Sequence, residues 1–286
     1  MTIFIDGKRD DDAKVSVRDH GLLYGDGVFE GLRMEARAVF RLDDHMRRLA
    51  FGLRSIGLEL PGGVARARDA VIATCRAHDE DDAYLRLVVT RGVGALGVDP
   101  TNCESPVVFC IADRIALYPE AKRSVGLDLV TASLRKPGPD QLDPRVKSLN
   151  YMNSVLAKRE AKMRHADESI VLNQRGTIAE ASAANLFVVR KGELLTPPTS
   201  DGALEGITRS SVFAIAAELG IPARESSLVR ADVFDADEVF LSGTGARIVA
   251  AGSLDGARIG TGDRPVFDRV SAAFPAFVRA NSVAIG

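Results

Sequence analysis

Short apolar runs typical of β-strands alternate with a few longer stretches of helical spacing along this sequence. In the first half the strand patterns cover residues 1–6, 39–42, 84–90 and 107–112. In the second half they cover residues 127–132, 169–172, 177–181, 185–189, 193–195, 238–242 and 247–250. Elements in this order must bury their apolar faces in layers of helix and sheet. The pattern predicts an α/β (α+β) fold of two domains, the second richer in strands.

Helical patterns separate these strands. Asp43 is positioned to cap a helix whose apolar side chains recur every three or four residues up to Ile56. Further helices are expected at 64–77, 151–164 and 208–219 and near the C-terminus, with Gly220 ending the third. Residues 115–126 are less periodic and contain Pro119. We expect an N-terminal α/β domain at 1–117, a linker at 118–126 and a strand-rich α/β domain at 127–286.

The bulk composition excludes several classes of function. The 286 residues carry a net charge of −2, so no global field attracts nucleic acid. No apolar run approaches the roughly 18–20 residues that span a bilayer. The four histidines have no metal-ligand spacing, and the three cysteines show no CxxC pair. We expect a cytoplasmic protein with no metal, no nucleic acid, no membrane association and buried thiols.

The segment Gly92–Gly97 has the GxGxxG spacing of a dinucleotide fingerprint and follows the strand pattern at 84–90. In that fingerprint the glycines open a helix whose N-terminus binds a pyrophosphate. Here the following residues include Pro100 and have no apolar helical period. We interpret this segment as a flexible loop.

Two other glycine-containing motifs could hold a phosphate group. In Leu204–Arg209 a glycine precedes the predicted helix, so that its first N–H groups could bind an anion. An ordinary capped helix accounts for the same residues. In Ser242–Ala246 small residues and the Thr244 hydroxyl follow a strand, which suits a backbone anion nest. A tight connection between two strands is an equal alternative.

Two charged residues stand in apolar surroundings. Lys147 lies between apolar neighbours just before a predicted helix. If Lys147 is buried, its amine would be neutral and able to form a Schiff base. Its local sequence by itself favours a solvated loop lysine. Glu180 lies on an otherwise apolar strand, where it is either exposed or paired with a partner such as a protonated ring nitrogen.

Taken together and in this order, the motifs resemble those of the class IV (fold-type IV) aminotransferases, which use pyridoxal 5′-phosphate (PLP). The matching segments are Leu23–Gly31, Asp44–Leu49, Val146–Tyr151, Gly176–Phe187, Leu204–Arg209 and Ser242–Ala246. The resemblance runs from about residue 3 to residue 280 and is greatest to the branched-chain amino-acid aminotransferases. It implies a two-domain fold of the D-amino-acid aminotransferase type and a homodimer or higher homo-oligomer.

The resemblance also implies a role for each matching residue around PLP. Lys147 would form the internal aldimine and carry the proton during catalysis, and Glu180 would pair with the pyridinium nitrogen. Tyr151 would bind the phenolic oxygen, and Leu204 would pack on the ring. Arg48 lies beside the apolar stripe of its helix and so could leave the core to bind the phosphate. The other phosphate ligands would be Ile207, Thr208 and Thr244.

Substrate binding is implied for a second set of residues. The positions that match the branched-chain pocket are Tyr24, Phe29, Gly31, Tyr84 and Arg86, with Thr244 and Gly245 facing the α-carboxylate. Leu96 and Val98 stand where D-amino-acid enzymes carry an Arg-x-His anion trap, which favours aliphatic side chains. Two departures from the family bear on the substrate: the Ala181–Asn185 segment, and Arg247 after the glycine-rich turn.

These residues predict a transaminase that exchanges the amino group between an L-branched-chain or other aliphatic amino acid and 2-oxoglutarate by a ping-pong route. Its partners would be amino-acid and keto-acid substrates. Two relatives of the same family are alternatives: a D-amino-acid aminotransferase, and an aminodeoxychorismate lyase that releases pyruvate. A cofactor-free binding protein is the alternative outside PLP chemistry.

Overall fold

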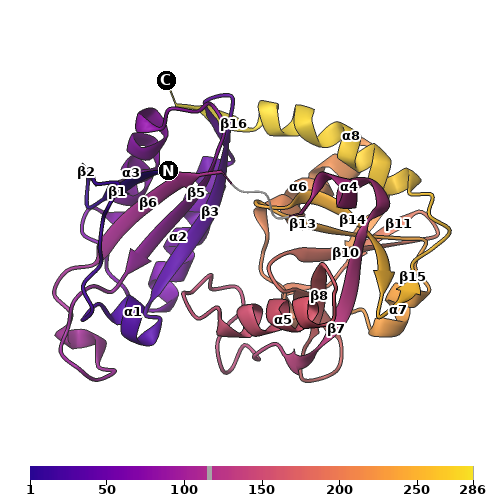
Figure 1. The fold of residues 1–286 in the computed structure, drawn as a ribbon, viewed down its shortest axis with the longest axis horizontal. Helices are drawn as coiled ribbons and strands as arrows, with labels where there is room; N and C mark the ends of the chain where they lie inside the picture. The colour runs from indigo at the N-terminus through magenta and orange to yellow at the C-terminus, as the bar shows by residue number, and fades with distance from the viewer. Residues whose placement is uncertain (115–117, 286) are drawn as a thin grey trace. The chain divides into compact units, whose positions relative to one another are not determined.

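The computed structural model describes residues 1–114 and 118–285, which divide into two compact units (Figure 1). Unit 1 comprises the described residues of Met1–Ile115, Val146–Asn150 and Arg279–Gly286. Unit 2 comprises those of Ala116–Arg145 and Tyr151–Val278. The short segment Val146–Asn150 therefore returns from unit 2 to unit 1, and it contains Lys147.

Unit 1 is built on a seven-stranded antiparallel sheet. Its elements are β1 (Thr2–Ile5), β2 (Lys8–Arg9), α1 (His20–Tyr24), β3 (Gly27–Glu35), β4 (Ala38–Phe40), α2 (Leu42–Ser55), α3 (Gly63–Ala77), β5 (Ala83–Thr90), the 3₁₀ turn η1 (Pro100–Asn102), β6 (Val107–Asp113) and β16 (Ser282–Ala284). The strand order is β16-β4-β3-β5-β6-β1-β2, and every neighbouring pair is antiparallel (Figure 1).

Helices α2 and α3 pack against one face of this sheet. Because strand side chains alternate between faces, β3 and β5 each send every second residue into the core with the helices. These core residues include Val28, Leu32, Met34, Leu85, Leu87 and Val89 from the strands and Met46, Leu49 and Leu53 from α2. The residues between them, such as Phe29 and Arg86, lie on the opposite face.

Unit 2 contains a mixed sheet of nine strands. Its elements are α4 (Glu120–Val125), β7 (Leu127–Arg135), α5 (Met152–Met163), β8 (Glu168–Leu172), β9 (Ile178–Ala181), β10 (Asn185–Arg190), β11 (Glu193–Thr196), the 3₁₀ turn η2 (Thr199–Asp201), α6 (Ile207–Glu218), β12 (Ala223–Glu225), α7 (Arg230–Phe234), β13 (Glu238–Gly243), β14 (Arg247–Leu254), β15 (Ala257–Arg258) and α8 (Pro265–Ala280). The order is β12-β11-β10-β13-β14-β7-β8-β9, with β15 paired to β14.

The helices of unit 2 pack on this sheet around a second apolar core. Helix α5 contacts β7 and β8, α4 contacts β14, and α6 contacts β12 and β13. Helix α8 is held by the buried Glu238 carboxylate, which accepts hydrogen bonds from the N–H groups of Val266 and Phe267 at 2.9 and 2.7 Å. In the described part of the chain, none of the helices combines the length and apolar composition needed to cross a bilayer.

Most strands and helices expected from the sequence are present, but several observed elements were not expected, among them the short α1, α7, β2, β12, β15 and β16. Strand β3, a long central strand, was not predicted. Asp43 does not cap α2: the N-cap is Arg41, whose φ of 48° lies in the left-handed region, and Asp43 sits in the first turn. There its carboxylate pairs with Arg68. In the segment expected as a linker, Glu120–Val125 form α4 within unit 2, while residues 115–117 lie outside the described residues.

Candidate active site

The segment that contains Lys147 runs beside β3 in an extended conformation. Val28 and Ser148 form an antiparallel bridge, and the Phe29 N–H donates to the Lys147 carbonyl at 3.0 Å. Phe29 and Lys147 are thus direct neighbours on the same face. The Lys147 Nζ atom lies 4.4 Å from the centroid of the Phe29 ring. Lys147 is therefore partly buried against an aromatic surface, unlike the solvated loop lysine that its local sequence favours.

The face of unit 1 that carries Lys147 gathers four of the predicted substrate residues. The Arg86 guanidinium carbon lies 4.5 Å from the Phe29 ring centroid and 5.5 Å from that of Tyr84. Gly31 pairs with Arg86 in the sheet, and a Cβ atom at Gly31 would collide with the Tyr84 hydroxyl. An amine and a guanidinium thus meet at the Phe29 ring, and the guanidinium also contacts the Tyr84 phenol ring, a combination suited to holding a carboxylate.

The opposite face of β3 carries a buried ionic cluster that sequence reasoning did not find. The Glu30 carboxylate has no exposed surface and accepts from Arg48 through Nε at 2.8 Å and Nη2 at 2.7 Å. It also contacts His45 Nδ1 at 2.7 Å. Burial by itself would raise the pKa of Glu30, but Arg48 and then His45 outweigh it and lower this pKa to about 2. Burial, the largest influence, lowers the pKa of His45.

Arg48 therefore does not leave the core as its position on the helix led us to expect. Its side chain is only 11% exposed because Glu30, directly across from α2, holds it in a bidentate pair. This pairing fixes the orientation of the guanidinium group. The phosphate-binding role of Arg48 stays a prediction.

In unit 1, helix α1 and the Gly92–Gly97 loop, which both carry predicted substrate residues, are joined by hydrogen bonds. The Tyr24 hydroxyl accepts from the Gly97 N–H at 2.9 Å, and the Tyr24 ring stands edge-on to His20. The Nε2 atom of His20 in turn contacts the Ala95 carbonyl at 2.9 Å. The Gly92–Gly97 segment is thus a loop, as predicted, and not the start of a helix. Leu96 within this loop and Val98 just after it are 83% and 82% exposed.

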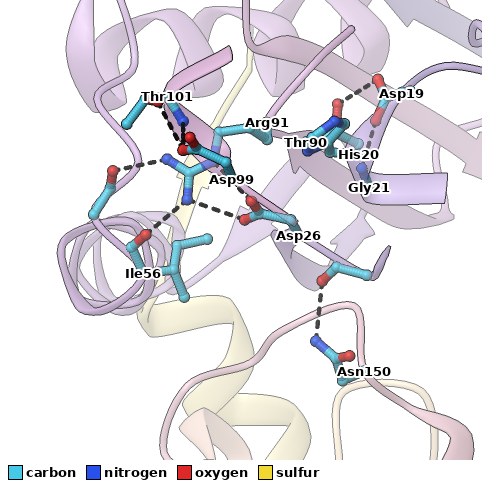
Figure 2. Close-up of polar contacts among 12 residues, drawn as sticks. Asp19, His20, Gly21, Asp26, Ile56, Thr90, Arg91, Asp99, Thr101 and Asn150 are labelled. Carbon is cyan, nitrogen blue, oxygen red and sulfur yellow. Dashed lines mark hydrogen bonds and ion pairs between the residues drawn. The ribbon is translucent and has the colours of Figure 1, made fainter. Parts of the chain in front are cut away.

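Figure 2 shows the polar contacts beneath these loops. Asp19 accepts from the Gly21 N–H and the Thr90 hydroxyl, at 2.7 and 2.8 Å, and so joins α1 to the end of β5. The Arg91 guanidinium bonds both carboxylate oxygens of Asp26 and the Ile56 carbonyl at the end of α2. These contacts give the loops a rigid base.

In unit 2, Glu180 is buried on β9 and is held by three donors within the part of the chain that the structure describes. Lys136 Nζ lies 2.5 Å from Oε1, while the Leu204 N–H and Asn185 Nδ2 lie 3.0 and 3.2 Å from Oε2. Of the two alternatives for Glu180, an exposed or a buried and paired side chain, the second is therefore correct, and the partner is the Lys136 ammonium. Burial tends to lower the pKa of Lys136, but Glu180 and, to a smaller extent, Tyr151 raise it overall.

The two glycine motifs of unit 2 both lie at the ends of regular elements. Helix α6 begins at Ile207, and its N-cap residue is Gly206, which has no side chain. A Cβ atom at Gly206 would collide with Asn185 Oδ1, so glycine is required there. Thr244 and Gly245 form the turn between β13 and β14, and Arg247 follows with a φ of 58° and an exposed side chain. The prediction of a tight connection between two strands at Ser242–Ala246 is therefore correct. Such a turn is also compatible with the anion nest that was the other alternative.

The Ala181–Asn185 segment, which departs from the family pattern, forms a tight turn. The Ala181 N–H donates to the Ala184 carbonyl at 2.8 Å, and the Ser182 hydroxyl donates to the buried Glu168 at 2.5 Å. Asn185 ends this turn, and its Nδ2 reaches both Glu180 and the Leu204 carbonyl. The turn therefore places Asn185 where it orients Glu180.

Sequence reasoning missed Glu30, His45 and Lys136. Glu30 had no signal comparable to that of Glu180, because its strand was not predicted and also carries Arg33 and Glu35. Lys136 has no comparable local signal, because it follows Arg135 in a loop rich in proline and glycine. In residues 1–114 and 118–285, no group of three or more His, Cys, Asp or Glu side chains could hold a metal ion.

Comparison with known proteins identifies the family. Residues 27–254 match the family Amino-transferase class IV. A putative branched-chain-amino-acid aminotransferase of Methanocaldococcus jannaschii is 45% identical over 258 residues, 90% of this chain and 88% of the relative.

Two solved structures are similar over the full length of this chain. A crystal structure of Escherichia coli branched-chain amino acid aminotransferase has a TM-score of 0.95 at 32% identity and covers 100% of this chain and 99% of that one. The branched-chain amino acid aminotransferase of Thermobaculum terrenum, solved in its PLP-form, has a TM-score of 0.85 at 28% identity and covers 100% and 98%.

These findings confirm the fold type, the enzyme class and the PLP cofactor that the sequence motifs implied. The chain belongs to the class IV aminotransferases.

Proposed function

We propose that this enzyme transfers the amino group between an L-branched-chain or other aliphatic amino acid and 2-oxoglutarate by a ping-pong route. The observation that carries the proposal is the Lys147 amine lying against Phe29, on the face that also carries Arg86. The names of the relatives support the branched-chain substrate. The apolar Leu96 and Val98 support an aliphatic side chain, because neither can bind a second carboxylate.

The chemistry of the donor groups fits PLP in each unit separately. In unit 1 an amine and an oriented guanidinium, those of Lys147 and Arg48, suit the aldehyde and the phosphate of the cofactor. In unit 2 the buried Glu180 carboxylate suits a protonated ring nitrogen, and the N-terminus of α6, where Gly206 is the N-cap, suits a phosphate.

The residues proposed to hold PLP follow from these groups. Lys147 would bind the cofactor covalently, Glu180 would accept the ring N–H, and Tyr151 would donate to the phenolic oxygen. The phosphate ligands would be Arg48, the Ile207 and Thr208 N–H groups and Thr244, with Leu204 packed on the ring. When bound, PLP supplies an electron sink that makes the Cα proton of the substrate acidic.

The chain's own residues then position the substrate and move one proton. Lys147 Nζ would take the proton from the substrate Cα and deliver it to the aldehyde carbon (C4′) of the cofactor, since an amine on an apolar surface is a suitable base. Tyr24, Tyr84 and Arg86 would hold carboxylates, and the N–H groups of Thr244 and Gly245 would bind the α-carboxylate. Phe29, Gly31, Leu96 and Val98 would shape the side-chain pocket, and Arg247 would alter its charge.

We further propose a homodimer or higher homo-oligomer in the cytoplasm. The exposed Leu96 and Val98 of unit 1 and the exposed Met152, Val155 and Leu156 of α5 form apolar surface of the kind that subunit contacts bury. Sedimentation of the holoenzyme at micromolar concentration should give at least a dimer. A monomer that retains full activity would contradict this part of the proposal.

An amino-donor panel tests the proposed substrate. The purified holoenzyme is mixed with L-leucine, L-valine, D-alanine or D-glutamate and 2-oxoglutarate, and glutamate of defined configuration is measured. We expect L-glutamate from the L-aliphatic donors. Turnover of D-donors alone would support the D-amino-acid enzyme instead. Pyruvate released from aminodeoxychorismate without a keto-acid acceptor would support the lyase.

Two variants link this activity to Lys147. K147A should lose turnover with every donor. Lys158 provides the matched control, because it also approaches an aromatic ring, that of Tyr118 at 5.2 Å, but has no proposed cofactor role. K158A should retain turnover.

A further inference from the structure

A second lysine touches the proposed PLP site. Lys136 follows β7, and its main-chain N–H donates to the Leu172 carbonyl at 2.8 Å. A Cβ atom at Gly202 would lie 3.2 Å from the Lys136 Cγ atom, so the side-chain stem is closely covered. The side chain is 15% exposed, and its ammonium lies 2.5 Å from the Glu180 carboxylate, which is 8% exposed. The pair is therefore largely desolvated and its geometry is fixed.

The charge on Lys136 excludes it as the nucleophile that binds the cofactor. Burial alone would release its proton, but the contact with Glu180, aided by Tyr151, raises the pKa of Lys136 overall. Schiff-base chemistry requires a neutral amine, and this amine stays protonated. A fixed cation beside the carboxylate must have another effect on the site.

That effect follows from how a carboxylate shares a proton with a pyridine nitrogen. A carboxylate has about four acceptor positions. Lys136, Leu204 and Asn185 contact three of those on Glu180 in the described part of the chain, which leaves room for one further donor. A cation 2.5 Å from Oε1 attracts the negative charge that Glu180 carries when the shared proton lies on the ring nitrogen. A proton shared between Glu180 and a ring nitrogen is therefore driven toward the nitrogen.

We propose that Lys136 is a positioning residue that keeps Glu180 ionised and oriented, so that the pyridine nitrogen of the cofactor carries the proton. The inference rests on the proposed role of Glu180. Lys136 acts through Glu180 and does not touch the reacting atoms. It sets how strongly the ring withdraws electrons.

The test measures the protonation state of the ring nitrogen in the holoenzyme. Wild type and variants are loaded with PLP labelled with ¹⁵N in the ring, and the ¹⁵N chemical shift distinguishes pyridinium from pyridine. K136Q keeps a hydrogen-bond donor but removes the charge, whereas K136R keeps the charge. We expect a pyridinium shift in wild type and K136R and a displacement toward neutral pyridine in K136Q. The PLP dissociation constant of K136Q should rise roughly tenfold to a hundredfold, the size of a lost charge-assisted hydrogen bond.

The matched control is K158Q, which removes a lysine from a second lysine–glutamate pair of unit 2, one in which the glutamate is buried and the lysine side chain is 36% exposed. Lys158 lies 2.9 Å from Glu168, which also accepts from Tyr118 and Ser182. Circular dichroism checks the fold of each variant. K158Q should keep the pyridinium shift and the wild-type affinity for PLP. A general effect of removing buried charge would instead change both variants alike and would overturn the proposal.

Two other results would also overturn it. One is a wild-type ¹⁵N shift in K136Q with PLP affinity within twofold of wild type. The other is a neutral pyridine in the wild-type holoenzyme. Should K136Q not fold, K136R carries the test: a neutral pyridine in K136R contradicts the proposal, and a pyridinium supports it. Wild type that binds no PLP would refute the proposed function itself, a result distinct from an unaffected K136Q.

Discussion

Two buried glutamates, one in each unit, are bonded in different ways. Glu30 in unit 1 contacts two side chains that can carry positive charge, a bidentate arginine and a histidine. Glu180 in unit 2 contacts one lysine and two neutral N–H donors. Both lie on buried strands, Glu30 on β3 and Glu180 on β9.

This difference in bonding partners indicates that the Glu30 carboxylate stabilises the fold, whereas the Glu180 carboxylate is suited to binding a ligand. The bonds of Glu30 join β3 to α2, and its partners His45 and Arg48 come from consecutive turns of that helix. The bonds of Glu180 come from a loop and a turn and leave acceptor capacity unused. We therefore expect changes at Glu30 to act mainly on folding and changes at Glu180 to act mainly on activity.

The largest expected effect is on the stability of E30A. Removing this carboxylate leaves Arg48 buried without its partner, which typically costs about 3–5 kcal/mol. The free energy of unfolding from urea titration of the holoenzyme measures the loss. A decrease below about 1 kcal/mol would show that the cluster does not stabilise unit 1.

In contrast to E30A, E180Q should reduce activity more than stability. The amide retains the shape of the side chain but cannot favour a protonated ring nitrogen. We expect kcat/KM to fall by about 10²–10³, as when one preorganised electrostatic contact is lost. The free energy of unfolding should change by less than that of E30A. A large loss of stability with unchanged kcat/KM would reverse the distinction between the two glutamates.

Lowering the pH should reduce the free energy of unfolding, because folding lowers the pKa of Glu30. Its pKa is about 2 in the folded chain against an ordinary value of 4.5, so the unfolded state binds the proton first. The stabilisation is complete above pH 4.5 and is lost as the pH falls toward 2, by an amount on the order of 3 kcal/mol.

His45 adds to this loss below its ordinary pKa of 6.5, because burial lowers its pKa as well. Urea titrations at several pH values measure the slope. E30Q should flatten the acid part of the curve, and a slope equal to that of wild type would contradict the assignment.

The smallest effect is expected at Tyr24. Y24F removes the hydrogen bond from the Gly97 N–H, worth about 1 kcal/mol at a partly exposed position. We expect faster amide hydrogen exchange in Gly92–Gly97 and a higher KM, with little change in global stability. Exchange equal to that of wild type would show that Tyr24 does not fasten this loop.

Much of the fold could be predicted because most strands and helices have clear apolar periods. Strand β3 was missed because its sequence, GVFEGLRME, contains two glycines and three charged residues and is buried almost throughout. The charge of Glu30 is satisfied by partners from α2, which a local pattern does not reveal. The cap of α2 was misassigned because Arg41 adopts a left-handed conformation that its residue type does not favour.

The candidate site could be predicted in part for a similar reason. Lys147 and Glu180 were identified by family motifs, and the structure shows which side chains each of them contacts. Lys136 and His45 depend on contacts between residues distant in sequence, such as the 44 positions that separate Lys136 from Glu180. Spacing along the chain carries no information on such contacts.

The central claim is that Lys147, and not the buried Lys136, holds the cofactor. Borohydride reduction of the PLP-loaded wild type fixes the cofactor to the lysine that binds it, and peptide mass spectrometry locates the adduct. We expect the adduct on Lys147, with Lys136 unmodified. An adduct on Lys136 with Lys147 unmodified, or no lysine adduct in protein saturated with PLP, would contradict this account.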